Sequence, residues 1–215
     1  ADCNLNCDSC DPDNRRADFC RIETTAGSAT FRNVKNPLDA AQVAEVIKNF
    51  SDDIPTQAVS FTGGEPLLHW DFVRDVAEAV GGCVKTFLET NGTLPAEFQK
   101  ISDTIDIVSM DIKLPSVVGK NLFSLHEKFL RAAQGKDLCV KIVVTGETAR
   151  EEFLSAVEVI AGVDAETLLI IQPVTPVNGV SAISARELLS LQAAALRLLK
   201  NVRVIPQTHK FINLL

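Results

Sequence analysis

The sequence predicts an α/β fold in which parallel strands form a partial or modified TIM-type (β/α) barrel. Short β-branched or apolar runs alternate along the chain with segments of helical periodicity, and this alternation is typical of a parallel sheet. Polar, glycine-bearing segments follow five of the runs, where barrel enzymes carry their active-site loops. With 215 residues, of which 46% are hydrophobic, the chain suffices for one domain of this kind.

The first ten residues, 1–10, form a predicted cluster loop, because three cysteines occur there in the spacing C-x3-C-x2-C. These are Cys3, Cys7 and Cys10. Thiolates are the usual ligands of iron–sulfur clusters, and a cubane held by only three of them has one iron open to another ligand. Because the loop begins directly after Ala1, we expect the N-terminal strand of the barrel to be truncated.

Two other interpretations of these cysteines compete with an iron–sulfur cluster. A structural zinc normally takes four protein ligands, often as two short pairs, whereas Cys20, Cys83 and Cys139 are scattered. A disulfide framework is typical of small secreted domains with little core, and this chain has enough hydrophobic sequence to do without one. The spacing therefore favours an iron–sulfur cluster, with zinc as the alternative.

Two further segments complete the predicted single domain. Residues 11–38 are polar and show no sustained period, so they are predicted to be a long loop insertion. Residues 39–215 are predicted to be a series of βα repeats. Their first helix begins near Asp39, because apolar residues recur at helical spacing over 43–50.

The apolar runs predict six strands, and the patterns between them predict five helices. The predicted strands span Ala58–Phe61, Val84–Leu88, Ile105–Met110, Leu138–Val144, Leu168–Ile171 and Val202–Ile205. The predicted helices span 70–81, 95–102, 121–134, 149–161 and 184–199. Each strand is expected to be a buried parallel strand.

The first two strand ends carry candidate ligand-binding residues. Thr62 to Pro66 read Thr-Gly-Gly-Glu-Pro; the glycines let a ligand approach the backbone closely, and Glu65 could receive an ammonium group. Glu89 and Asn91 follow the second strand and offer acceptors and an amide that suit the edge of a planar heterocycle. Simple turns are the alternative, because Gly-Gly and Asn-Gly are turn signals in any protein.

The later strand ends carry further candidates. Ser109, Asp111 and Lys113 alternate, so they share a face that could line the barrel mouth. Gln172 follows another strand, either as a ligand contact or as an exit residue before a proline. His209 follows the last strand, where it could bond an anionic substrate or titrate near neutral pH. A solvated strand end is the alternative for the polar residues.

Charge and composition narrow the classes of function. The formal net charge is −7 and the lysines and arginines are dispersed, so we expect a small-molecule partner and no nucleic-acid surface. No secretory signal and no apolar run long enough to span a bilayer are found. These features predict a cytoplasmic protein without a membrane segment, in a reducing compartment that suits an oxygen-sensitive cluster.

Together, the motifs resemble the radical S-adenosylmethionine (SAM) superfamily, whose hallmark is C-x3-C-x2-C followed by a Gly-Gly-Glu-Pro strand end. Within it the chain is similar to the 7-carboxy-7-deazaguanine synthases, through Thr-Gly-Gly-Glu-Pro-Leu-Leu, Glu-Thr-Asn-Gly-Thr, Ser-Met-Asp-Ile-Lys-Leu-Pro-Ser and Pro-Gln-Thr-His-Lys. The resemblance implies one radical SAM domain over 1–215. It also implies a lyase that converts 6-carboxy-5,6,7,8-tetrahydropterin to 7-carboxy-7-deazaguanine by radical ring contraction with loss of ammonia, for queuosine or archaeosine biosynthesis.

The resemblance further implies roles for individual residues. A [4Fe-4S] cluster would be held by Cys3, Cys7 and Cys10, and its open iron would bind the amine and carboxylate of SAM. The implied SAM-binding residues are Ser9, Asp11, Gly64, Glu65, Ser109, Met110, Asp111, Gln172 and Thr175. The implied substrate-binding residues are Thr62, Glu89, Asn91, His209 and, through the terminal carboxylate, Leu215.

The same resemblance implies an electron donor such as flavodoxin or ferredoxin, and a homodimer. It also implies Mg²⁺, but Pro12 stands where the family commonly has a threonine that helps to bind the ion, and proline has no side-chain oxygen. A radical SAM activase acting on a protein glycyl site is the first alternative, since it would share the cysteines but would not require Glu89 or His209. A zinc-binding interaction module is the non-enzymatic alternative.

Overall fold

The computed structural model describes residues 2–5, 7, 17–176 and 180–211. The strands of its main sheet are β3 (Ala58–Phe61), β4 (Lys85–Thr90), β5 (Ile107–Asp111), β6 (Asp137–Val144), β7 (Leu168–Pro173) and β8 (Val202–Val204). All pairs are parallel, and each strand lies beside the next one in sequence. This order is typical of a (β/α) barrel. Within the described residues β3 and β8 pair on one side only, so the sheet is an open part of a barrel, as predicted.

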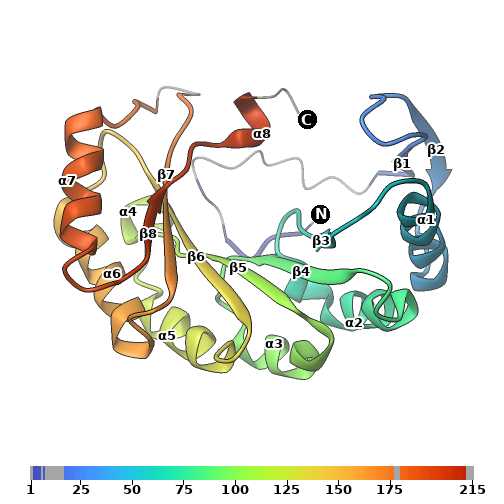
Figure 1. The fold of residues 1–215 in the computed structure, drawn as a ribbon, viewed down its shortest axis with the longest axis horizontal. Coiled ribbons are helices and arrows are strands. Elements are labelled where there is room, and N and C mark those ends of the chain that lie inside the picture. Colours follow the sequence, from blue (N-terminus) through green and yellow to red (C-terminus); the bar gives the residue numbers. More distant parts are fainter. Residues whose placement is uncertain (1, 6, 8–16, 177–179, 212–215) are drawn as a thin grey trace.

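Helices cover the outer face of the curved sheet (Figure 1). The five that connect its strands are α2 (Trp70–Val80), α3 (Pro95–Ile101), α5 (Phe123–Ala132), α6 (Arg150–Val163) and α7 (Ala185–Ala195). All six predicted strands and all five of these helices are confirmed, with their ends displaced by a few residues. The short elements that were not predicted are η1 (Pro66–His69), η2 (Ser102–Thr104), α4 (Pro115–Val118) and α8 (Thr208–Phe211).

The helix expected near Asp39 is α1 (Ala40–Asp53). Its start is fixed by a capping box: the Asp39 carboxylate accepts the backbone N–H of Gln42 at 2.8 Å, and the Gln42 side chain accepts the N–H of Asp39 at 2.9 Å. Its buried residue Ala44 packs with Val76 and Val80 of α2. No helix in the described part of the chain has the length and apolar character needed to cross a membrane.

The predicted loop insertion is wrong over residues 19–35. This part of the chain forms an antiparallel hairpin of β1 (Phe19–Glu23) and β2 (Phe31–Lys35). Most of its side chains are exposed or only half-buried, so the apolar alternation that identifies a half-buried strand is absent. The hairpin is held instead by local contacts: Glu23 accepts the N–H of Ala29 at 2.7 Å, and the Arg21 guanidinium lies 4.1 Å from the Phe31 ring centroid.

The hydrophobic core lies between the sheet and its outer helices. Val108 and Met110 of β5 and Val140 and Ile142 of β6 are fully buried there, while alternate residues of the same strands are half-buried and face inward. The expectation that each strand is buried as a whole is therefore wrong for the inner face. That face carries polar side chains because it lines a cavity.

Candidate active site

A cavity of about 220 Å³ lies at the carboxyl ends of β3, β4 and β5, the edge at which barrel enzymes carry their active sites. Backbone register explains its polar lining. Glu89 of β4 pairs with Ser109 of β5, and Asp111 of β5 pairs with Lys141 of β6. The residues that line the cavity are Cys3, Leu5, Cys7, Thr62, Gly63, Gly64, Glu89, Thr90, Asn91, Ser109, Asp111, Lys113 and Lys141.

The structure thus brings together candidates from four separate segments. Two of the three cysteines of the C-x3-C-x2-C motif, Cys3 and Cys7, line the same cavity as the strand-end residues Thr62 and Glu89. The shared face expected for Ser109, Asp111 and Lys113 is confirmed, because all three line the cavity. In the Gly63–Gly64 turn both residues have positive φ, 88° and 60°, which brings the backbone to the cavity at little steric cost for glycine.

Two residues of the cysteine loop anchor it to the strand ends. The backbone carbonyl of Asp2 accepts the N–H of Glu65 at 2.8 Å, and the Asp2 carboxylate lies 3.1 Å from His69 Nε2. The Asn4 side chain donates to Thr93 Oγ1 at 2.9 Å and accepts from Asn91 Nδ2 at 2.9 Å. The loop is therefore held by the ends of β3 and β4.

The Glu65 side chain is fully buried and does not line the cavity, and its predicted place near an ammonium group stays a prediction. The carboxylate accepts hydrogen bonds from the Leu67 N–H at 3.1 Å, the Thr90 hydroxyl at 2.8 Å and the Asn91 N–H at 2.7 Å. Burial raises the pKa of Glu65, while these three donors oppose the shift by favouring the carboxylate. Glu65 therefore joins the ends of β3 and β4.

The Asn91 side chain faces protein groups. Besides its bond to Asn4, its carbonyl oxygen accepts the N–H of Thr93 at 3.1 Å and the Thr93 hydroxyl at 2.6 Å. Asn91 lines the cavity, but its amide is engaged in holding the loop.

The Met110 side chain does not line the cavity, and the predicted role of Met110 in binding SAM stays a prediction. Successive residues of a strand face opposite sides, so Met110 points into the core when Ser109 and Asp111 point into the cavity. Its side chain is fully buried and packs against Gly92, where an added Cβ would lie 2.4 Å from Met110 Cε.

The structure does not bring Gln172 and Thr175 into the cavity lining. Gln172 is half-buried in β7, and the backbone N–H of Thr175 donates to Gln207 Oε1 at 2.9 Å. His209 lies in α8. The candidates Ser9, Cys10, Asp11 and Leu215, and also Pro12, lie outside the described residues.

Sequence reasoning missed Lys141. It lies in the middle of the apolar run of β6, and the signal that identifies it is a charged residue between Val140 and Ile142, both of which are fully buried. Asp111 Oδ2 accepts a hydrogen bond from Lys113 Nζ at 2.9 Å and lies 3.4 Å from Lys141 Nζ. The two ammonium groups therefore flank one carboxylate within the cavity.

The donors fit an iron–sulfur cluster better than a disulfide framework. Thiols that face a cavity are suitable ligands for such a cluster. Among the described residues, Cys3, Cys20, Cys83 and Cys139 are free thiols. No three His, Cys, Asp or Glu side chains gather into a metal-binding group within the described residues, and the third cysteine of the motif, Cys10, is outside them.

Comparison with known proteins agrees with the geometry. The Radical SAM superfamily matches residues 1–160, so the chain belongs to this superfamily and is a radical SAM enzyme. A solved radical SAM methyltransferase from Sphaerobacter thermophilus shares the fold, with a TM-score of 0.59 at 12% identity, over 81% of this chain and 58% of that chain.

Curated relatives place the chain more narrowly. The 7-carboxy-7-deazaguanine synthase of Geobacter sulfurreducens is 39% identical over 214 residues, which are 98% of this chain and 86% of that protein. That of Methanocaldococcus jannaschii is 32% identical over 229 residues, covering 100% of this chain and 90% of that protein. The chain therefore belongs to the 7-carboxy-7-deazaguanine synthase family.

Proposed function

We propose that the chain is a radical SAM lyase that converts 6-carboxy-5,6,7,8-tetrahydropterin to 7-carboxy-7-deazaguanine. Family membership supports the reaction. The structural observation that carries the proposal is the shared cavity, in which Cys3 and Cys7 face the Gly63–Gly64 turn and the polar inner faces of β4 and β5. An enzyme with a protein-bound radical source and a small substrate needs these groups in one enclosed space.

The proposed ligand set for a [4Fe-4S] cluster is Cys3, Cys7 and Cys10. When bound there, the cluster would supply the one-electron reduction of SAM on which the ring contraction of the pterin with loss of ammonia depends. Gly64, Ser109 and Asp111 line the cavity and are the proposed SAM contacts. Ser9, Asp11, Gln172 and Thr175 stay proposals based on the family resemblance.

The chain's own contribution is to bind and orient the substrate and to limit access of water. Glu89 lines the cavity, and one of its oxygens accepts the Ser60 hydroxyl at 3.3 Å. A pterin presents adjacent N–H donors on its pyrimidine edge, and a carboxylate can accept two of them. Thr62 is the second proposed contact in the cavity, and His209 and Leu215 stay proposals for the substrate.

Further parts of the proposal concern partners and location. Cleavage of SAM requires a one-electron donor, for which we propose flavodoxin or ferredoxin. A homodimer is proposed from the family resemblance, and a cytoplasmic location is proposed from the sequence features described above. If Mg²⁺ takes part, substrate oxygens and water would have to replace the threonine oxygen that Pro12 lacks.

The experiment is an anaerobic incubation of iron- and sulfide-reconstituted protein with SAM, a strong reductant and the carboxylated tetrahydropterin. We expect 7-carboxy-7-deazaguanine in mass spectra, and none with Cys7→Ser, the matched control. SAM cleavage without conversion of the pterin would exclude the synthase reaction and favour the activase alternative. One zinc and no iron per chain would instead favour the zinc-binding module and exclude the enzyme.

A further inference from the structure

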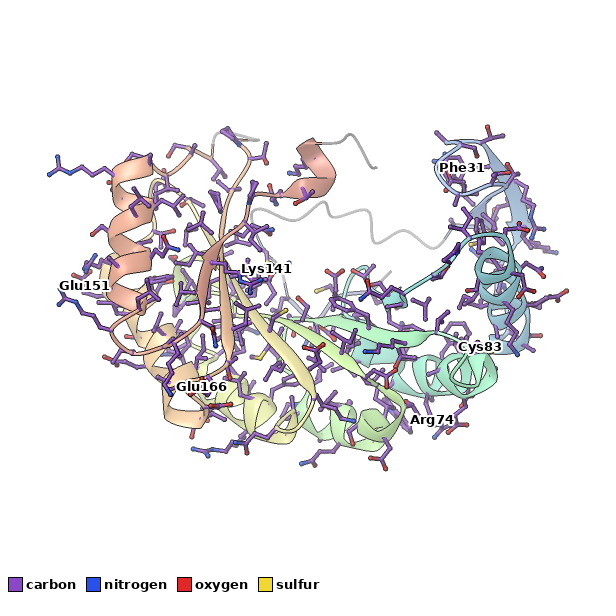
Figure 2. All side chains as sticks on the ribbon, viewed as in Figure 1. Phe31, Arg74, Cys83, Lys141, Glu151 and Glu166 are labelled. Atoms are coloured by element: carbon purple, nitrogen blue, oxygen red, sulfur yellow. The ribbon has the colours of Figure 1, made fainter. Side chains whose placement is uncertain are left out.

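Lys141 is an inward-facing charge on a strand whose outer face is fully apolar. Its neighbours Val140 and Ile142 are fully buried against the helices, whereas Figure 2 shows Lys141 on the inner face of the curved sheet. Its side chain is only 22% exposed. Because desolvating an ammonium group is unfavourable unless it is paired, this position requires anionic partners.

Among the described residues, the anionic partner of Lys141 is Asp111, which makes a shorter contact with another lysine. Asp111 Oδ2 lies 2.9 Å from Lys113 Nζ but 3.4 Å from Lys141 Nζ. Charge-assisted N–H···O bonds have lengths of about 2.7–2.9 Å, so Lys113 makes the close bond and Lys141 the looser contact. Since Asp111 makes its close bond to Lys113, the looser contact leaves Lys141 with donor hydrogens for a further anion.

An ammonium group has three donor hydrogens, and Lys141 presents its group to the cavity that holds the proposed active site. We propose that Lys141 binds a ligand carboxylate in this cavity and that Asp111 positions its ammonium group. The inference rests on the proposed function, which puts two carboxylates there, one on the methionyl part of SAM and one on the pterin. The chemistry is the same for both sources, so the test separates them.

The variants are Lys141→Met, which keeps the length of the side chain and removes the charge, and Lys141→Arg, which keeps the charge. Lys200→Met is the matched control, because Lys200 pairs with Glu166 on the surface, away from the cavity. The probes are SAM, unreactive 6-carboxypterin, and pterin without the carboxylate. Their binding to reconstituted, unreduced protein is measured by calorimetry, with iron content and thermal unfolding recorded for each variant.

We expect Lys141→Met to weaken binding of one carboxylate-bearing probe by about 10- to 100-fold, since bonds to charged groups contribute about 1.5–3 kcal/mol. Binding of pterin should be unchanged, and Lys141→Arg should retain most of the affinity. A loss confined to 6-carboxypterin assigns the contact to the substrate, and a loss confined to SAM assigns it to SAM. Equal affinities of wild type and Lys141→Met for both probes would overturn the inference.

If Lys141→Met does not fold, the same contact is tested by changing the ligand instead of the protein. The methyl ester of 6-carboxypterin should then bind to wild type and to Lys141→Arg more weakly than the free acid does, and SAM methyl ester is compared in the same way. Equal binding of acid and ester in both pairs would overturn the inference while leaving the proposed function intact. Wild-type protein that binds neither pterin would instead contradict the proposed function.

Discussion

The carboxylate of Glu65 accepts a hydrogen bond from the backbone N–H of Asn91, with 2.7 Å between Oε2 and the nitrogen. The bond joins the ends of two neighbouring strands, β3 and β4. Through its side chain, Asn91 in turn holds Asn4 of the cysteine loop. The Gly-Gly-Glu-Pro and Glu-Thr-Asn-Gly motifs thus fix the loop that carries the proposed cluster ligands.

Glu65→Gln should destabilise the protein. A glutamine amide has one acceptor oxygen. Its NH₂ group would replace the other carboxylate oxygen and would face an N–H or O–H group whose hydrogen bond that oxygen now accepts. Leaving a buried donor unpaired costs about 1–3 kcal/mol, and we expect a loss of this size in urea unfolding. Glu158→Gln, at an exposed position of α6, is the control; equal stability of the two variants would contradict the role of Glu65.

Asn4→Ala should weaken retention of the iron without unfolding the domain. The change removes both bonds from the loop to Asn91 and Thr93 but leaves the Asn91–Thr93 bonds in place. Two hydrogen bonds of about 1 kcal/mol each correspond to about a 30-fold change in an equilibrium constant, which is an upper limit for this half-exposed pair. The measurement is the fraction of iron that stays bound to the protein during incubation with a chelator. Asn201→Ala, far from the loop, should behave as wild type, and equal loss from both variants would refute the anchoring.

Gly92→Ala should be more destabilising than an alanine at another glycine of similar conformation. Gly92 has φ +68°, and a Cβ would lie 2.4 Å from Met110 Cε. Gly119 has φ +70° with nothing within 4 Å of a Cβ, so Gly119→Ala measures the conformational cost alone, about 1–2 kcal/mol. Overpacking should add about 1–3 kcal/mol at Gly92. The double variant Gly92→Ala/Met110→Ala tests the clash. If the two side chains did not clash, adding Met110→Ala would restore none of the stability that Gly92→Ala loses.

His126 should make stability depend on pH. Burial lowers its pKa to about 4 from the ordinary 6.5, so the folded protein binds this proton less readily than the unfolded chain. The contribution to stability is complete above pH 6.5 and is lost as the pH falls toward 4. Between pH 7.5 and pH 5 the loss should be about 2 kcal/mol, since one pKa unit corresponds to about 1.4 kcal/mol.

The measurement for His126 is urea unfolding at several pH values, for wild type and for His126→Phe. The variant should lack this part of the pH dependence, so the difference between the two proteins should shrink or reverse as the pH falls. Parallel pH profiles would show that His126 is not buried in its neutral form.

The sequence predicted the repeating elements because each strand is an apolar run and each helix has its own period. It did not predict the hairpin of residues 19–35, whose strands bury too little to show alternation. It located Ser109 and Asp111 correctly, since strand alternation fixes their common face. The same rule places the Met110 side chain on the opposite face, in the core.

Other parts of the site depend on contacts between segments far apart in sequence. The local sequence around a carboxylate at a strand end is the same whether the side chain binds a ligand or bonds to the next strand, as Glu65 does. The position of Lys141 within an apolar run is a sequence signal, but its pairing with Asp111 becomes visible only when the register sets the two residues side by side. These partners follow from the tertiary fold, so local sequence pattern could not predict them.

The central claim is that one cavity holds the cluster, SAM and the pterin. Its most direct test is an anaerobic crystal structure of the reconstituted protein with SAM and unreactive 6-carboxypterin. We predict density for a cubane on Cys3, Cys7 and Cys10, with SAM against Gly64 and the pterin edge facing Glu89. A single zinc ion with four protein ligands, or a pterin bound outside this cavity, would contradict the claim.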